Sequence, residues 1–206
     1  MRWEAMKLKF DAGLDYQQEA IAAVRDVFQG QMPKQSLFSV AAINQEQMSL
    51  NFAHSPQQLS LVQGIGNRLT IDREDLLKNI RSVQLRHGLP QSAALGNELN
   101  LDIEMETGTG KTYVYLRTLL ELNEAYGFTK FIIVVPSVAI KEGVKKTLDI
   151  TREHFRGLYK NVNYDAYIYD SVDRIRDFAT ASTIQIMVMT IAAFNKTSNV
   201  INNYHD

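Results

Sequence analysis

The sequence predicts an α/β protein in which helices flank a parallel sheet. After residue 100, short apolar runs alternate with segments of helical period, which is typical of strand–helix repeats. The run at 131–135 is continuously β-branched or aromatic. A glycine-rich stretch at 108–112 also stands between a predicted strand and a predicted helix. These three observations together favour a sheet with a ligand-binding loop at the carboxyl end of one strand.

Composition is that of a globular protein. Of 206 residues, 45% are apolar and 22% are charged, and there is no cysteine. Disulfides and thiolate zinc sites are therefore excluded. No run approaches the roughly 18 apolar residues of a membrane span, and the first ten residues lack a signal-length apolar stretch. The sequence predicts a soluble intracellular protein.

The N-terminal part predicts one helix and then a long insertion. Residues 15–28 place apolar side chains on one face, and Asp15 with Gln18 resembles a capping box. Residues 30–99 are rich in Gln, Ser and Asn and predict one helix, over 73–88, with "QGIGNRL" at 63–69 as a turn. We expect three segments: the N-terminal helix with a nucleotide contact (1–29), an irregular insertion (30–99) and a nucleotide-binding lobe (100–206).

The elements of the lobe follow in order. "LDIEM" (101–105) predicts a strand leading into the glycine-rich stretch, and residues 112–127 predict a helix ended by Gly127. Residues 131–135 predict a strand covered on both faces, broken by Pro136, with Ser137 capping the next helix. Strands are then predicted at 164–170 and 183–190, with a short helix over 171–178 between them.

The stretch "EMETGTGKTY" (104–113) predicts a phosphate-binding loop. It keeps the closing half of the Gly-x4-Gly-Lys-Thr pattern, with Met105 in place of the opening glycine. Gly108 and Gly110 allow backbone N–H groups to converge on phosphate oxygens. Lys111 can reach the β- and γ-phosphates, Thr112 can bind magnesium, and the following helix adds its positive end. The alternative is a glycine turn beside a surface lysine.

Positive charge is concentrated in residues 130–160, called here the basic segment. It holds seven basic and three acidic residues, a local charge of +4 in a chain of net charge −1. Such a segment can bind a phosphate backbone. A solvated helix face would show the same charge pattern.

Longer stretches resemble a known family. "METGTGKT" resembles the first motif of superfamily 2 helicases and translocases, in which the opening glycine is commonly replaced. "FIIVVPSVAIKEGV", "AAFNKTSNVI" and the front segment "FDAGLDYQQEAIAAVRDVF" resemble the restriction (Res) subunit of type III restriction–modification enzymes. The resemblance implies a RecA-like lobe of an ATP-dependent DNA translocase and site-specific endonuclease that uses ATP and Mg²⁺. It also implies double-stranded DNA and a modification (methyltransferase) subunit as partners, no membrane, and a cytoplasmic, prokaryotic location.

The resemblance also implies roles for single residues. Gln17 in "YQ" matches a glutamine that reads the adenine edge, although a polar residue on a helix face is an alternative. The resemblance assigns binding of the nucleotide and its magnesium ion to Thr107, Gly108, Thr109, Gly110, Lys111 and Thr112. Of these, Lys111 and Thr112 are the catalytic residues and Thr112 is the metal ligand. DNA contacts fall to Pro136, Ser137, Lys141, Lys145 and Thr190. Thr190 fits a helix cap equally well.

One expected motif is missing. A motor that hydrolyses ATP needs an acidic pair, usually Asp-Glu, and this sequence contains no such dipeptide. The pattern predicts an N-terminal part of a larger subunit that binds nucleotide and is inactive by itself. Two alternatives stay open: another superfamily 2 motor, such as a type I restriction subunit or a repair helicase, and a nucleotide- or DNA-binding module without catalysis.

Overall fold

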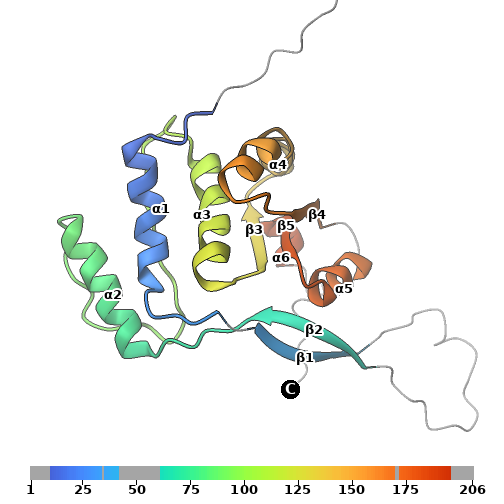
Figure 1. The fold of residues 1–206 in the computed structure, drawn as a ribbon, viewed down its shortest axis with the longest axis horizontal. Helices are drawn as coiled ribbons and strands as arrows, with labels where there is room; N and C mark the ends of the chain where they lie inside the picture. Colours follow the sequence, from blue (N-terminus) through green and yellow to red (C-terminus); the bar gives the residue numbers. More distant parts are fainter. Residues whose placement is uncertain (1–9, 34, 42–60, 170–171, 196–206) are drawn as a thin grey trace, which may run out of the picture.

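A three-stranded parallel sheet forms the centre of the molecule (Figure 1). The computed structural model describes residues 10–33, 35–41, 61–169 and 172–195. The strand order is β3 (Lys130–Val135), β5 (Ile184–Thr190), β4 (Tyr164–Ile168). The predicted α/β class and these three strands are confirmed.

Strand β5 is the buried centre of the sheet. Its residues from Ile184 to Met189 are at most 4% exposed, because β3 and β4 pair with it on either side. Helix α4 (Val138–Leu158) packs against all three strands and buries Leu148 and Phe155. The short α6 (Ile191–Phe194) contacts β3 and β5.

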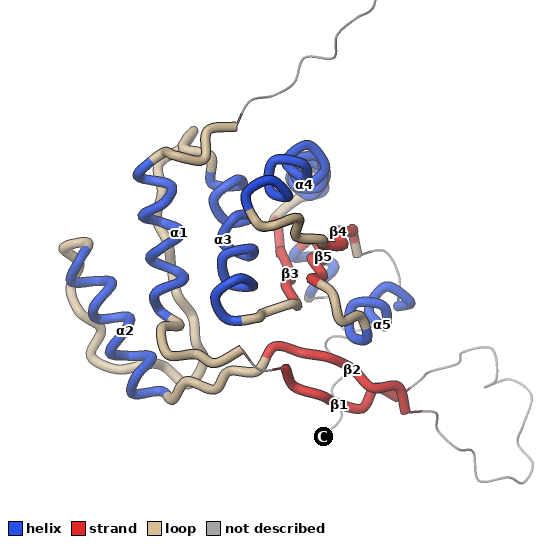
Figure 2. The backbone as a smooth tube through the Cα atoms, viewed as in Figure 1, coloured by secondary structure: helices blue, strands red, loops and turns tan. Residues whose placement is uncertain are grey.

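Two further helices pack outward from the sheet. Helix α3 (Lys111–Tyr126) lies against α4, and α1 (Asp15–Val27) lies against α3 (Figures 1 and 2). Helix α3 buries Leu116 and Leu120 and ends at Gly127, whose φ of +70° is the left-handed conformation that glycine adopts readily. This confirms the predicted end of the helix.

The predicted helix caps have mixed outcomes. The Ser137 hydroxyl accepts a hydrogen bond from the Ile140 N–H at 3.4 Å, so Ser137 caps α4 as expected. The prediction for α1 is wrong. Leu14 occupies the cap position, Asp15 is the first helical residue, and the Gln18 amide donates to the Ala12 carbonyl instead of closing a capping box.

The insertion is more regular than the sequence suggested. Strands β1 (Gln35–Ala41) and β2 (Leu61–Asn67) form an antiparallel ribbon, and α5 (Val172–Thr180) contacts β2. The turn predicted at 63–69 is therefore wrong, since Gly64 and Gly66 lie in β2 and pair with residues of β1. Helix α2 (Arg73–Arg86) confirms the helix predicted there and packs against α1.

Two buried or bridging amides hold the root of this ribbon. Gln31, 5% exposed, donates to the Arg68 carbonyl at 2.9 Å and accepts from the Thr70 N–H at 2.8 Å. The Asn67 side chain accepts from the N–H groups of Thr129 and Lys130 and donates to the Lys130 carbonyl. The ribbon is thus joined to the first residues of β3.

The strand predicted over 101–105 is wrong. Leu101–Met105 has no strand partner in the described part of the chain, and Leu101 and Ile103 are 45% and 50% exposed. The expectation that helices cover both faces of β3 also fails, because Ile132 and Val134 are 42% and 41% exposed. An isolated apolar segment cannot form a strand without a neighbour to receive its backbone hydrogen bonds.

Candidate functional site: the glycine loop and the carboxyl edge of the sheet

The glycine loop adopts the backbone that the sequence predicted for it. Gly108 and Gly110 have φ values of +85° and +82°, in the left-handed region. Helix α3 then begins at Lys111, so its unpaired N–H groups face the loop. This combination of left-handed glycines and a helix N-terminus is suited to anion binding.

Within the loop, one carbonyl oxygen accepts two side-chain hydrogen bonds. The Lys111 Nζ and the Thr109 hydroxyl each donate to the Glu106 carbonyl at 2.7 Å. Thr107 lies in the turn, and Thr112 is half-buried in the first turn of α3.

Gln17 lies directly against this loop. It is 6% exposed, and its Nε2 donates to the Thr109 carbonyl at 2.9 Å. A Cβ at Gly110 would come within 2.8 Å of that nitrogen, so only glycine fits there without displacement. The structure therefore brings together two segments 92 residues apart that sequence reasoning had linked only by resemblance.

A large cavity opens beside the loop. It measures about 1240 Å³ and is lined by α1, α2 and residues 94–109. Tyr16 and Val24 line it on α1, and Glu104 and Glu106 line it near the loop. Among the residues that the structure describes, no group of three or more His, Asp or Glu side chains could hold a metal ion.

Three side chains of α2 hold the chain that leads to the loop. Arg81 donates to the carbonyls of Ser92 and Ala93, and Gln84 bonds the Ser92 N–H and hydroxyl. Arg73 donates to the Gly96 carbonyl. Sequence reasoning missed these contacts, because side-chain bonds to distant carbonyls leave no periodic signal.

Three of the five residues assigned to DNA lie at one edge of the sheet. Val135 and Thr190 are partners in the parallel register of β3 and β5, so Pro136 and Ser137 lie beside Thr190. The Thr190 hydroxyl accepts from the Ala193 N–H at 3.2 Å, so it caps α6. The cap anticipated as its alternative role is thus present.

The basic segment is largely committed to internal contacts. Lys145 bonds both carboxylate oxygens of Asp149, at 2.7 and 2.9 Å. Arg152 donates to the Tyr164 carbonyl and Arg156 pairs with Glu153. Across residues 130–160, all of which the structure describes, Lys141 and Lys146 form no ion pair. Lys146 is also exposed.

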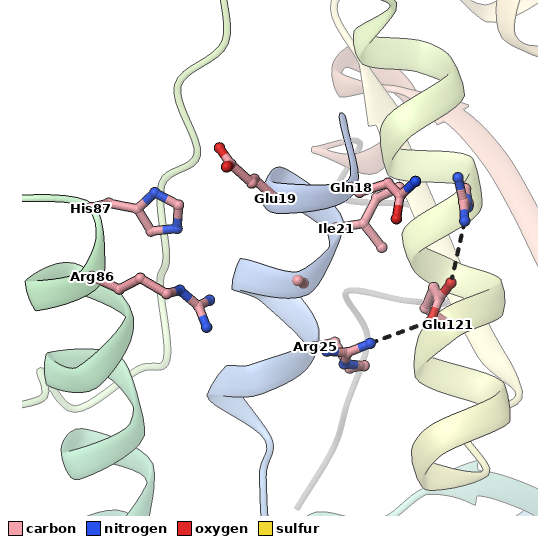
Figure 3. Close-up of a pocket in the computed structure, with 9 residues that line it drawn as sticks. Gln18, Glu19, Ile21, Arg25, Arg86, His87 and Glu121 are labelled. Atoms are coloured by element: carbon pink, nitrogen blue, oxygen red, sulfur yellow. Dashed lines mark ion pairs between the residues drawn. The ribbon is translucent and has the colours of Figure 1, made fainter. Parts of the chain in front are cut away.

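A polar network joins α1, α3 and α4 next to a second, smaller cavity of about 490 Å³ (Figure 3). Glu121 is within 3.8 Å of Arg25 and 3.9 Å of Arg117. The Tyr159 hydroxyl donates to Glu121 at 2.7 Å. Burial and the bond to Glu121 raise the pKa of Tyr159, so its hydroxyl remains a donor.

An aromatic cluster joins the first turn of α3 to α4. The Tyr113 hydroxyl lies 2.8 Å from the His154 Nε2, and the Phe10 ring stacks on Tyr113 at 6.0 Å between centroids. Burial, and then the charge of Arg117, lowers the pKa of His154. The neutral ring is therefore the favoured partner of Tyr113.

The fold is a parallel α/β sheet with flanking helices, and a glycine loop leads into one of these helices, α3. Residues 12–206 match the family model described as "Type III restriction enzyme, res subunit", and the chain belongs to that family. Its sheet and flanking helices are those of a RecA-like helicase lobe.

The curated relatives of the chain are Res subunits of type III restriction–modification enzymes as well. The chain is 36% identical over 140 residues to the type III restriction–modification enzyme EcoP15I Res subunit of Escherichia coli, covering 66% of this chain and 14% of the relative. It is 30% identical over 201 residues to the EcoPI Res subunit of Escherichia phage P1, covering 95% of this chain and 18% of the relative. The chain thus spans less than a fifth of their length. No described helix is long and apolar enough to cross a membrane.

Proposed function

We propose that this chain is the ATP-binding part of an ATP-dependent DNA translocase, the restriction subunit of a type III restriction–modification system. The observation that carries the proposal is the loop at 106–112 with Gln17 against it. Two left-handed glycines, the N-terminus of α3 and the Lys111 ammonium converge on one place, as an anionic phosphate group requires.

In this proposal each part of the loop has its own task. The N–H groups from Gly108 to Thr112 bind the phosphate oxygens, and Lys111 leaves the Glu106 carbonyl to pair with the β- and γ-phosphates. The Thr112 hydroxyl would hold Mg²⁺, which would supply positive charge to offset that of the phosphates. Gln17 reads the adenine edge.

DNA would lie across the carboxyl edge of the sheet. Pro136, Ser137 and Thr190 are adjacent there, and α4 extends Lys141 and Lys145 from the same edge. Contacts of this kind follow the phosphate backbone and read no bases. The modification subunit of the restriction–modification system would then be the partner that recognises the DNA sequence.

The direct test is nucleotide affinity. ATP binding is measured by isothermal titration calorimetry with and without Mg²⁺ for the unaltered chain, Lys111→Ala and the control Lys78→Ala, which changes an exposed lysine on α2. We expect Lys111→Ala to weaken ATP binding at least about tenfold, the loss of one charge-assisted contact, and Lys78→Ala to leave it unchanged. Equal affinity in all three proteins would refute the assignment of the loop.

A further inference from the structure

A single arginine connects the beginning of α1 to the helix that carries the glycine loop. We propose that Arg117 is a positioning residue for nucleotide recognition. Its guanidinium fixes the turn before α1, and α1 in turn holds Gln17 against the loop. The inference rests on the proposed function, because it concerns the same nucleotide site.

The main contact of Arg117 is with a backbone carbonyl outside its own helix. Its Nη1 donates to the Ala12 carbonyl at 2.8 Å, across 105 positions of sequence. The same carbonyl accepts from the Gln18 Nε2 at 3.1 Å. The bond from Arg117 carries a positive charge, so it is the stronger of the two. The turn at residues 10–14 is thereby held by α3.

The guanidinium of Arg117 has polar partners on three sides. Its Nε donates to the Tyr159 hydroxyl at 3.1 Å, and its Nη2 lies 3.9 Å from the Glu121 carboxylate. The side chain is 13% exposed. Glu121 is itself 3.8 Å from Arg25 of α1, an ion pair marked in Figure 3. A planar group held on three sides can aim one N–H at Ala12, which a lysine ammonium would do less well.

Helix α1 connects the turn that Arg117 holds to the glycine loop. The Gln17 N–H donates to the Leu14 carbonyl at 3.0 Å in the first turn of α1, and the Gln17 side chain then reaches the Thr109 carbonyl. Lys111 and Arg117 lie six positions apart on one helix. The same rigid element therefore carries the phosphate-binding lysine and fixes the residue proposed to read the base.

The first experiment separates base recognition from phosphate binding. Dissociation constants for ATP, GTP and tripolyphosphate are measured for the unaltered chain, Arg117→Met, Arg117→Lys, Gln17→Ala and the Gln17→Ala/Arg117→Met pair. The control is Arg86→Met, because Arg86 pairs with Asp26 of α1 at 2.8 Å and makes no contact with residues 10–14.

We expect Arg117→Met to reduce the preference for ATP over GTP by roughly five- to tenfold, the value of one hydrogen bond. Tripolyphosphate affinity should not change, and Arg117→Lys should lose less of the preference. The Gln17→Ala/Arg117→Met variant should show the same preference for ATP over GTP as Gln17→Ala, because both substitutions remove the same base contact. Full preference in Arg117→Met, or an equal loss for tripolyphosphate, would overturn the proposal.

A second experiment stands apart from nucleotide binding. Hydrogen exchange is compared at residues 12–18 and 118–126 in the unaltered chain, Arg117→Lys and Arg86→Met. Faster exchange at 12–18 alone in Arg117→Lys supports the positioning role, and unchanged exchange there contradicts it. If the unaltered chain binds neither ATP nor tripolyphosphate, the proposed function fails, and exchange alone decides whether Arg117 fixes α1.

Discussion

Gly110 is the residue at which the glycine loop and helix α1, the two parts of the proposed nucleotide site, come closest to a steric conflict. Gly108 and Gly110 have nearly the same φ, but a Cβ at Gly108 would meet nothing within 4 Å, whereas one at Gly110 would meet Gln17 at 2.8 Å. The sequence predicts the need for glycine at both positions. It does not reveal that Gln17 limits the space at only one of them, because that limit comes from a helix distant in the sequence.

This difference gives a prediction for stability. Gly108→Ala and Gly110→Ala should each lose roughly 1 kcal/mol of unfolding free energy from left-handed strain, and Gly110→Ala should lose more because of the clash. Gln17→Ala should restore part of the Gly110→Ala loss and none of the Gly108→Ala loss. Urea unfolding of the three single variants and the two double variants with Gln17→Ala measures this coupling. Strictly additive losses would contradict the contact between Gln17 and Gly110.

At the scale of elements, His154 joins α3 to α4 through Tyr113. Its pKa in the folded chain is lowered by burial and by Arg117, so the unfolded chain takes up a proton at higher pH than the folded chain. The stabilising contribution is complete above the ordinary value of 6.5 and is lost as pH falls below it.

We therefore expect the chain to lose more unfolding free energy between about pH 7.5 and about pH 5.5 than His154→Gln, which cannot titrate. Urea midpoints at the two pH values give the comparison, and His87→Gln, a change at a helix end on the surface, is the matched control. A pH dependence equal in the unaltered chain and in His154→Gln would mean that His154 does not titrate with folding.

The ribbon is the second element whose attachment can be tested. Asn67→Ala removes two hydrogen bonds accepted from the N–H groups of Thr129 and Lys130 and one donated to the Lys130 carbonyl. Since Asn67 is exposed, we expect a loss of only about 1 kcal/mol. Asn163→Ala, at an exposed position before β4, should change stability by less than about 0.5 kcal/mol. Equal thermal unfolding of the two variants would argue against this attachment.

The elements also show where sequence reasoning succeeds and where it stops. Helices α2 and α3 were predictable because apolar spacing and terminal glycines are local signals. Strand β3 was predictable because residues 131–135 are apolar without interruption, and β5 because Gln185 alone interrupts the apolar run from Ile184 to Met189. The ribbon was not, since Gly64 and Gly66 suggest a turn unless the partner strand is known. The strand prediction for residues 101–105 failed for the opposite reason, because this segment has the residue pattern of a strand but no partner strand among the described residues.

For the molecule as a whole, ATP binding and hydrolysis should separate. The loop and Gln17 supply contacts for a nucleotide, but the sequence has no Asp-Glu pair to hold magnesium and orient water. We expect the purified chain to bind ATP weakly and to hydrolyse it at well below about 1 per second, the lower end of ordinary enzyme rates. Phosphate release with and without DNA measures this. Turnover that Lys111→Ala abolishes would show that the chain contains a complete catalytic site.

DNA binding should be weak, and it should depend on the charge of the whole surface and not on one site. The basic segment has a local charge of +4, but Arg152, Arg156 and Lys145 are engaged with neighbours. We expect feeble binding to any duplex or single strand, with an affinity that falls as salt rises. Lys141→Ala/Lys145→Ala/Lys146→Ala should weaken it further and flatten the salt dependence.

The single variants rank these lysines. Lys141 and Lys145 share a helix face, which by itself would make Lys145 contribute more to DNA binding than Lys146. The Lys145 ammonium, however, is held by Asp149 at 2.7 Å. A phosphate must displace that carboxylate, whereas Lys146 is exposed and forms no ion pair within α4. Lys141→Ala and Lys146→Ala should therefore each reduce the salt slope by about 1, and Lys145→Ala by less. Fluorescence anisotropy with two unrelated duplexes and a single strand across a salt series provides the slopes. A larger effect from Lys145→Ala would mean that Asp149 gives way to DNA, and a strong preference for one duplex would place sequence recognition in this chain.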